Sequence, residues 1–363
     1  MSRQLQSDKV LFGAVVGLVL FGALMVYSAS AVMAADRYSS GDYFLLRQLA
    51  WAVAGLIAVG TLMHTDYRLL ASPMVVFPAL ALEIILLVVV LFMSPINHAH
   101  RWFHLGVASF QPSELAKIIL TVFLAFFLDM RKGAVNDLRH TLLPIALVTG
   151  IMGVLVLREP DLGTTLALGM VLAVMLFCSG LNLWYFVGAG IAAVPALYFL
   201  IFHSAYRSRR WSAFLDPYSD PLGKGFHILQ SYIAIGTGGI TGMGLMEGKQ
   251  KLFFLPEPQT DFIFAVVGEE LGLIGTVAVV IVFAVILARG LKASAGCKDD
   301  FGRLLALGLT VMIVGQALIN MSVVLGLLPT KGIPLPFVSY GGSSLLVNLV
   351  AVGILLNISQ QAT

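Results

Sequence analysis

Residues 255–272 read LPEPQTDFIFAVVGEELG and mark the point where a polar, proline-broken segment turns into a long apolar run. A carboxylate inside a bilayer is costly unless it faces a partner or a water-filled cavity, so acids at such a junction are candidate functional residues. Asp261 follows Pro256 and Pro258, which disfavour a helix, and it precedes an apolar run that predicts one over residues 262–288. We therefore expect Asp261 to lie at the mouth of a membrane-spanning helix.

The whole chain has the composition of a membrane protein. Of its 363 residues, 59% are hydrophobic and 11% are charged, and the mean hydropathy is +0.94. A soluble domain carries about 25% charged residues, and a membrane-spanning helix needs roughly 20 apolar residues. We predict an all-α polytopic membrane protein that forms a single integral-membrane domain over residues 1–363. The ten expected spanning segments are 10–30, 45–64, 73–94, 112–129, 141–157, 161–179, 182–202, 262–288, 304–326 and 337–358.

The positive charges predict that both termini face the cytoplasm. With this orientation, the inner loops hold ten Lys and Arg residues, and the short outer loops and helix mouths hold five. Loop 203–261 adds six more Lys and Arg residues on the outside. This loop is close to the length of about 60 residues above which the charges of a loop no longer determine orientation. The first apolar run is longer than a signal-peptide core, so we expect a retained helix. Cys178 and Cys297 both fall on the inner side, so no exported disulfide is expected.

Loop 203–261 is expected to be a large, ordered extracytoplasmic loop. Its aromatic residues favour packing against the membrane face, and residues 226–235 favour a short amphipathic helix in the interface. Residues 236–244, GTGGITGMG, match neither the dinucleotide-binding pattern nor a Walker loop. We therefore interpret them as a flexible turn.

Two readings of Asp261 follow from the residues alone. An Asp before an apolar run is a favourable helix N-cap, and the same carboxylate can face a substrate cleft. Glu269 and Glu270 lie two turns deeper, and we expect each to make a buried hydrogen bond to a neighbouring helix. A divalent cation, Mg²⁺ or Mn²⁺, held by Asp261 is a further option, because such sites often use a single carboxylate.

Other polar clusters also lie at predicted helix ends. Glu114 and Lys117 are spaced to form an ion pair on one helix face, or Lys117 is aimed at an anion in a cavity. Arg158 and Asp161 flank a tight turn between two spans, or they contribute to a shared polar pocket. Arg101 is a cation at headgroup level, next to an aromatic anchor. The nearby histidines match no zinc motif.

Near the end of the chain, residues 332–344 break an apolar segment with two prolines and then two glycines. Irregular backbone at membrane depth is tolerated only where it is buried in protein or lines a wet cavity. Ser339 lies in this segment and is a candidate substrate contact. Gln316, Asn320 and Asn348 are expected to form hydrogen bonds between helices.

Four stretches together resemble one family, the SEDS proteins of shape, elongation, division and sporulation. They are 110–118 (FQPSELAKI), 159–164 (EPDLGT), 255–272 and 329–344 (PTKGIPLPFVSYGGSS), and they follow the family order over nearly the whole chain. Segments 247–261 and 329–332 resemble the division branch more than the elongation branch. The resemblance implies a ten-helix fold with cytoplasmic termini and a large extracytoplasmic loop between helices seven and eight.

The resemblance also implies an activity, which is the polymerisation of lipid II by an inverting hexosyltransferase at the outer face of the bacterial cytoplasmic membrane, at the division septum. Asp261 matches the essential acid of the family, and we expect it to act as general base. Cations would stabilise the diphosphate leaving group, and Glu114, Asp161 and Ser339 would complete the substrate site. The candidate cations are Arg101, Lys117, Arg158, Arg210, Lys249 and Lys331.

The resemblance further implies a class B penicillin-binding protein and other divisome proteins as partners, with no nucleic-acid partner. Three alternatives remain open at this point. The first is a lipid II flippase, for which Glu83, Glu269 and Glu270 are the membrane-depth acids. The others are an elongation-type polymerase and a noncatalytic scaffold. Polar residues that gather at one membrane face favour an enzyme over a transporter.

Overall fold

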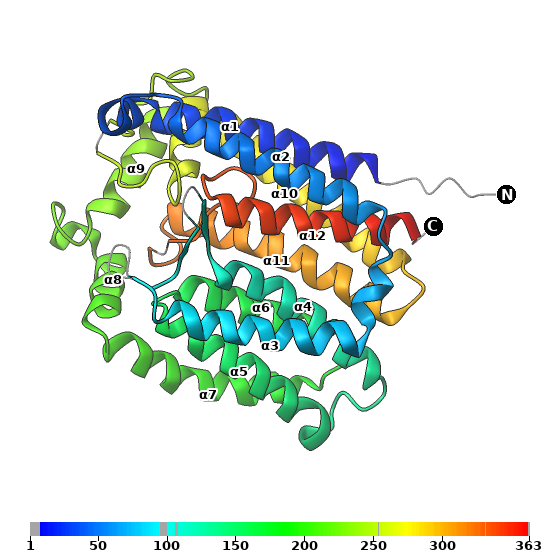
Figure 1. Ribbon diagram of the computed structural model, residues 1–363. Helices are drawn as coiled ribbons and strands as arrows, with labels where there is room; N and C mark the ends of the chain where they lie inside the picture. Colours follow the sequence, from blue (N-terminus) through cyan, green and yellow to red (C-terminus); the bar gives the residue numbers. More distant parts are fainter. Residues whose placement is uncertain (1–7, 95–99, 106–107, 253, 331, 362–363) are drawn as a thin grey trace.

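The computed structural model describes residues 8–94, 100–105, 108–252, 254–330 and 332–361. Twelve α-helices account for most of these described residues (Figure 1). They are α1 (Lys9–Tyr38), α2 (Tyr43–Met63), α3 (Pro73–Val90), α4 (Pro112–Met130), α5 (Leu143–Arg158), α6 (Leu162–Cys178), α7 (Leu183–Phe202), α8 (Ala205–Leu215), α9 (Phe226–Gly238), α10 (Ile263–Gly296), α11 (Asp300–Val324) and α12 (Gly342–Gln361). Short helical turns form η1 (Tyr67–Ala71), η2 (Leu138–Leu142) and η3 (Pro217–Ser219).

Each of the ten predicted segments corresponds to one of these helices, and α8 and α9 lie within loop 203–261. Over the described residues, seven spans are long and apolar enough to cross a membrane: α1, α2, α3, the continuous stretch Leu138–Arg158, α10, α11 and α12. The prediction of a helical, multi-pass membrane protein is therefore confirmed. The helix expected over 226–235 is present as α9, and its place in the membrane interface stays a prediction.

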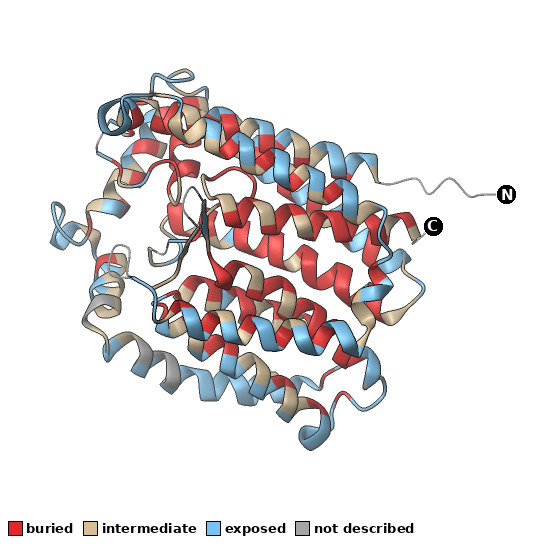
Figure 2. Ribbon diagram, viewed as in Figure 1, coloured by how far each residue is buried: buried red, intermediate tan, exposed pale blue. Residues whose placement is uncertain are grey.

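The central helices are α11 and α12. In each of them, 83% of the residues in the most apolar 18-residue stretch are buried within the protein (Figure 2). Helix α11 packs against α4, α6 and α10, while α12 packs along α2. Helix α7 has no buried side chain among its described residues, and its principal contact is with α8. Apolar side chains that cover α7, such as Ile191 and Val194, are more than 60% exposed, as expected for a face that meets lipid.

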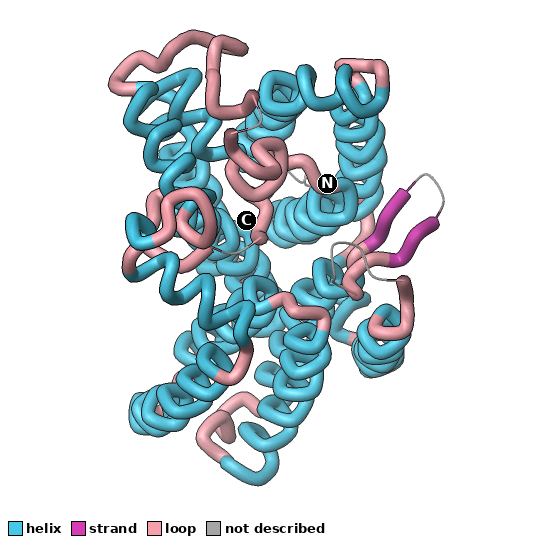
Figure 3. The backbone as a smooth tube through the Cα atoms, turned by 90° about the vertical axis from the view of Figure 1, so that its left-hand side faces the viewer, coloured by secondary structure: helices cyan, strands magenta, loops and turns pink. Residues whose placement is uncertain are grey.

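The two ends of the helical bundle differ in character. The first and last described residues lie together at one end, and α8 and α9 lie at the other (Figure 1). The second end also carries a small hairpin of β1 (Phe103–Leu105) and β2 (Ala108–Phe110), paired antiparallel with Phe103 opposite Phe110 (Figure 3). The hairpin is a local addition to the all-α fold, in which two short runs between α3 and α4 satisfy each other's backbone groups.

Two predicted helix boundaries are wrong. Helix α12 begins at Gly342 and not at 337, because residues 332–341 form an irregular, mostly buried segment. The predicted continuous helix 262–288 extends to Gly296 as α10, but it is broken at Gly272, which has φ +64° and ψ −159°. This backbone conformation is open to glycine and strained for other residues.

The run 236–244, which we call the glycine strap, packs directly on the break in α10 and is not the flexible turn that was predicted. A Cβ at Gly238 would overlap the Gly268 carbonyl, and one at Gly242 would overlap that of Glu270. Only glycine permits this close approach of two backbones. Four backbone hydrogen bonds join the two segments: Met243 to Glu269 (3.0 Å), Gly244 to Glu270 (3.0 Å), Leu273 to Gly239 (2.9 Å) and Ile274 to Ile240 (3.2 Å).

Candidate active site

Asp261 lies in the turn that enters α10, at the bundle end that carries α8 and α9. The N-cap residue of α10 is Phe262, which makes no side-chain cap, so the capping role considered for Asp261 is not what the structure shows. Its main-chain carbonyl instead accepts a hydrogen bond from Asn320 Nδ2 at 3.0 Å. The same amide donates to the Ile333 carbonyl at 2.7 Å. Asn320 on α11 therefore links the turn at Asp261 to the segment at Ile333. The Asp261 carboxyl faces Gly332, where a Cβ would lie 2.9 Å from Oδ2.

The environment of Asp261 makes its carboxyl a much weaker acid than usual. Burial raises the pKa of Asp261 to about 7, and the negative charges of Glu257 and Asp161 act in the same direction. The guanidinium groups of Arg210 and Arg101 oppose this increase. A carboxyl that titrates near neutral pH is suited to accept a proton from a hydroxyl group, because the ideal catalytic pKa lies close to the working pH.

Ser339 fixes the backbone next to Asp261. Its hydroxyl donates to the Thr260 carbonyl at 2.5 Å and accepts from the Leu335 amide at 2.8 Å. The amide of Tyr340 donates to the Gln259 carbonyl at 2.8 Å, which adds a second link between the two loops. Ser339 is 4% exposed, so its hydroxyl is occupied by protein contacts. These contacts hold the turn before Asp261, and the substrate contact expected of Ser339 stays a prediction.

Glu114 and Lys117 form the predicted ion pair on α4. Lys117 Nζ lies 2.9 Å from Glu114 Oε2, and both side chains are almost fully buried. The ammonium also donates to Gln316 Oε1 at 2.5 Å, while Gln316 Nε2 donates to the Pro334 carbonyl at 2.9 Å. Of the two alternatives for Lys117, the structure shows the ion pair with Glu114. The pair connects α4, through α11, to the segment that faces Asp261.

The turn between α5 and α6 carries a second buried polar group. Arg101 donates to the Glu159 carbonyl at 2.7 Å and to the Pro160 carbonyl at 2.6 Å. Asp161 caps α6 by accepting from the Thr164 amide at 3.0 Å and its hydroxyl at 2.9 Å. Burial, together with the neighbouring charge of Asp161, raises the pKa of Glu159 to about 9. Arg101 and Asp161 are thus fixed in position, and the charges of both act on Asp261.

Comparison with known proteins agrees with this geometry. A family model for FtsW, RodA and SpoVE, described as "Cell cycle protein", matches residues 8–363. A "probable peptidoglycan glycosyltransferase FtsW" of Trichlorobacter lovleyi is 46% identical over 360 residues, which cover 98% of this chain and 94% of that protein. Stage V sporulation protein E of Bacillus subtilis is 39% identical and covers 94% of each chain. The chain belongs to the FtsW, RodA and SpoVE family.

Solved structures show the same family fold. A chain from a peptidoglycan synthase complex that coordinates polymerization and crosslinking superimposes with a TM-score of 0.80 at 31% identity, over 98% of both chains. RodA of Thermus thermophilus superimposes with a TM-score of 0.72 at 28% identity, over 98% of this chain and 97% of that one. The resemblance to the SEDS family is confirmed, and the match to FtsW proteins agrees with the predicted division branch.

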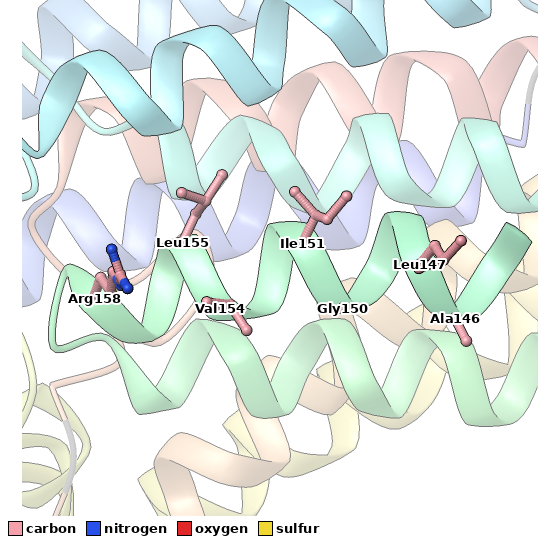
Figure 4. Close-up of a pocket in the computed structure, with 7 residues that line it drawn as sticks. All are labelled: Ala146, Leu147, Gly150, Ile151, Val154, Leu155 and Arg158. Carbon is pink, nitrogen blue, oxygen red and sulfur yellow. The ribbon is translucent and has the colours of Figure 1, made fainter. Parts of the chain in front are cut away.

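In this member of the family, Arg158 does not point into the Asp261 site. Its side chain is exposed at one end of an apolar groove on α5 (Figure 4). The prediction that Arg158 and Asp161 share one polar pocket is therefore wrong for Arg158. The end of a helix places neighbouring residues on different faces, because each step turns the side chain by about 100°.

The remaining predicted cations divide into three cases. Arg210 on α8 donates to the Thr330 carbonyl at 3.1 Å, and its charge acts on Asp261. Lys249 is exposed and is held through its main-chain amide, which donates to Glu269 Oε1 at 2.7 Å. Lys331 lies outside the described residues. Of these three, only Arg210 is shown to act on Asp261.

Glu270 belongs to a buried network that we call the loop latch, made of Ser28, Lys251 and Glu270. Lys251 Nζ lies 2.6 Å from Glu270 Oε1, and both side chains are at most 4% exposed. The Ser28 hydroxyl on α1 donates to Glu270 at 2.7 Å, and the Met246 amide donates to Glu270 Oε2 at 3.0 Å. The expected bond to a neighbouring helix is confirmed for Glu270. It is wrong for Glu269, which binds loop amides.

Sequence reasoning missed Lys251 and Glu257. Lys251 is one of several basic residues in a long loop, and no local pattern shows that it pairs with an acid 19 positions later. Glu257 acts on Asp261 through its charge, and the only available signal was its position in the same proline-rich turn. Among the described residues, no group of three or more His, Cys, Asp or Glu side chains is arranged to hold a metal ion.

Proposed function

We propose that this chain is a peptidoglycan glycosyltransferase of the division type, which polymerises lipid II into glycan strands at the outer face of the cytoplasmic membrane. The observation that carries the proposal is Asp261, a carboxyl whose pKa is raised to about 7 and on which the positive charges of Arg101 and Arg210 act. The relatives named FtsW support this choice. Ten helices that cross the membrane, with α8 and α9 outside the cell, would place Asp261 at the outer face.

In the proposed reaction, Asp261 takes the proton from the 4-hydroxyl of the acceptor sugar while that oxygen attacks the anomeric carbon of the donor. The new glycosidic bond forms as the bond to the lipid diphosphate breaks, and the diphosphate leaves with the electron pair. This direct displacement inverts the anomeric carbon. The diphosphate is a good leaving group and needs positive charge more than a proton. Arg101 and Arg210 supply that charge close to Asp261.

The surrounding contacts keep the base in position. Asn320 holds the Asp261 carbonyl, and Ser339 holds the preceding Thr260 carbonyl. Lys117 reaches the same segment through Gln316, so it acts here as a positioning residue. Positioning of reacting groups contributes several kcal/mol to catalysis when the geometry is held within a few tenths of an ångström.

A divalent cation, Mg²⁺ or Mn²⁺, is the second option for the role of Asp261. Because the described residues offer no cluster of three acidic or imidazole ligands, substrate diphosphate oxygens and water would have to complete the coordination of an ion held by Asp261. Such an ion would neutralise charge on the leaving diphosphate. Polymerisation that survives thorough chelation would remove this option.

The test is polymerisation of lipid II by purified protein in detergent, with and without a class B penicillin-binding protein. Asp261→Asn keeps the size of the side chain and removes the base, so we expect a rate loss of about 100-fold to 10,000-fold. Retained binding of the partner would show that the variant is folded. Wild-type rates from Asp261→Asn would exclude Asp261 as the base and would support a scaffold function.

A lipid II flippase is the alternative function, and one observation favours it. Glu83 on α3 is 1% exposed, and neither carboxyl oxygen has a hydrogen-bond partner among the described residues. The other two acids that suggested transport already have partners. Glu269 accepts a hydrogen bond from the Lys249 amide, and Glu270 pairs with Lys251. Glycan formation in detergent, where no membrane separates two compartments, identifies an enzyme.

We also propose that the protein works with a class B penicillin-binding protein and other divisome proteins at the septum. The related chain in the peptidoglycan synthase complex supports a crosslinking partner. Co-purification with the partner, and enrichment of a tagged protein at midcell, would test the two statements separately.

A further inference from the structure

The irregular segment 332–341 beside the candidate base is itself held by α1 and α2. An added Cβ at Gly22 on α1 would overlap the carbonyl oxygen of Phe337. An added Cβ at Gly342, where α12 begins, would overlap the indole ring of Trp51 on α2. Only glycine permits such close packing, so these two helices enclose the segment tightly.

The backbone of this segment does not hold its shape alone. Phe337 has φ +65°, in the left-handed region that favours glycine, and its side chain is 1% exposed. A bulky residue persists in that conformation only where the surrounding contacts outweigh the strain. Those contacts must come from neighbouring elements, because irregular backbone has no hydrogen-bond ladder of its own.

Gln48 on α2 binds the backbone of this segment at two points. Its Nε2 donates to the Ser339 carbonyl at 3.1 Å, and its Oε1 accepts from the Gly341 amide at 3.4 Å. The side chain is 1% exposed, so water does not compete for either bond. A buried backbone group that loses its partner costs free energy, which makes this amide a specific anchor on both sides of Tyr340.

The backbone that Gln48 anchors also holds the turn before Asp261. The Ser339 hydroxyl and the Tyr340 amide donate to the two carbonyls of residues 259–260. Asp261 follows directly in the chain. Two successive hydrogen bonds therefore connect α2 to the turn that carries the candidate base.

We propose that Gln48 is a positioning residue, through which α2 sets the place of the Asp261 carboxyl relative to the substrate. This inference rests on the proposed function, since it concerns the base of that reaction. The positive charges that act on Asp261 come from other elements, because Arg210 lies on α8 and Arg101 precedes β1. A shift of α2 along α12 therefore moves the base and leaves these cations in place, so it changes the rate of the reaction more than the affinity for substrate.

The first experiment measures kcat and KM for lipid II polymerisation by the full chain bound to its class B partner. Gln48→Met keeps the length of the side chain and removes both hydrogen bonds. We expect kcat to fall about ten-fold with KM unchanged, because a base held out of place loses rate without loss of ground-state binding. Gln48→Asn keeps a buried amide but shortens its reach, so it should show the same selective loss of kcat. Wild-type kcat in both variants, or a matching increase in KM, would overturn the proposal.

Asn357→Leu is the matched control for general loosening of the helix pair. Asn357 on α12 is 4% exposed and binds backbone at the opposite end of α2 and just beyond it. Its Nδ2 donates to the Met63 carbonyl at 2.9 Å, and its Oδ1 accepts from the Tyr67 amide at 3.1 Å. We expect its kcat to stay within about two-fold of wild type, because these bonds lie at the far end of α2 from the turn before Asp261. An equal fall in kcat for Asn357→Leu and Gln48→Met would overturn the proposal.

A double-mutant cycle tests the route from Gln48 to the turn. If Gln48 acts through the bond that Ser339 makes to Thr260, its removal should matter less once that bond is gone. In Ser339→Ala, Gln48→Met should therefore lower kcat about three-fold, against about ten-fold in the wild-type background. The same fold loss in both backgrounds would show that the two residues act independently and would overturn the proposal.

The second experiment reads the hold on the turn without turnover. Hydrogen exchange is measured at the amides of Leu335 and Tyr340, which report on the links within the segment and to the turn. Gln48→Met should speed exchange at both amides about ten-fold, and Asn357→Leu should leave both at wild-type rates. This pattern supports the positioning even if the wild type makes no glycan and the proposed function fails. Wild-type exchange in Gln48→Met would overturn the positioning even if the wild type polymerises lipid II.

Discussion

Substitution of Gly238 by alanine is expected to separate the glycine strap from the break in α10. An added Cβ would overlap the carbonyl oxygen of Gly268, and backbone atoms of Gly268 and Glu269 surround it. Because the obstacle is backbone, a side-chain rotation cannot relieve the overlap. Gly236 provides the matched control, since it lies in the same helix α9 and has no atom within 4 Å of its added Cβ.

The magnitude follows from the four backbone hydrogen bonds between the strap and residues 269–274. At about 1 kcal/mol net for each bond, their loss costs about 4 kcal/mol. Replacing a helical glycine with alanine returns at most about 1 kcal/mol, so Gly238→Ala should be destabilised by about 3 kcal/mol. Gly236→Ala should gain up to about 1 kcal/mol. The two variants should therefore differ by about 4 kcal/mol.

The assay is reversible unfolding of the purified protein in mixed micelles, with hydrogen exchange on the same samples. Faster exchange is expected in Gly238→Ala at the amides of Met243, Gly244, Leu273 and Ile274, and Gly236→Ala should keep wild-type protection. Equal unfolding free energies for the two alanine variants, with the four amides still protected, would refute the close backbone packing.

Three further predictions concern charge and position. Polymerisation should increase as pH rises through about 7, because burial and Glu257 raise the pKa of Asp261 and only its deprotonated form accepts a proton. Glu257→Gln removes a negative charge, so it should lower the pKa of Asp261 and move the acidic limb of the kcat/KM profile to lower pH. Lys251→Met leaves the buried Glu270 charge unpaired and should cost about 3–5 kcal/mol in the same unfolding assay. Ser339→Ala removes both hydrogen bonds next to Asp261 and should lower kcat about ten-fold with little change in KM, as measured by initial polymerisation rates.

The outcomes that contradict these predictions are distinct. An acidic limb that Glu257→Gln leaves in place, or moves to higher pH, would exclude the charge coupling. A Lys251→Met variant as stable as wild type would show that the pair contributes no net stability. If Lys251→Met and Glu270→Gln together are more stable than Lys251→Met alone, the unpaired charge is confirmed as the cause. Wild-type kcat in Ser339→Ala would show that the serine does not position Asp261.

Hydrophobic runs were sufficient to place the helices of this protein. Apolar segments of membrane length predicted ten helices close to their observed positions, because the backbone in a bilayer must satisfy its own hydrogen bonds. The resemblance of four short stretches predicted Asp261 as the central acid, and its perturbed pKa agrees with that choice. Both kinds of information are local in the sequence.

The parts that were mispredicted or missed depend on contacts between distant segments. The break at Gly272 is stabilised by the strap, about 30 residues earlier in the chain, so the apolar run itself looked continuous. The Ser339 hydroxyl donates to the Thr260 carbonyl and accepts from the Leu335 amide. Sequence spacing gives no sign of the contact with Thr260. Arg158 and Asp161 are three positions apart, yet they serve different surfaces because a helix ends between them.

The loop latch also bears on how this chain is made. Glu270 pairs with Lys251 only 19 residues earlier, whereas Ser28 is separated from Glu270 by 242 positions. A ribosome therefore delivers the acid to the membrane together with its own counter-ion, already present in the preceding loop. The Glu270 carboxylate is expected to enter the bilayer already paired with Lys251, and α1, made much earlier, adds its hydroxyl when the bundle closes. The order of synthesis thus supplies the counter-ion of Glu270 from the same chain.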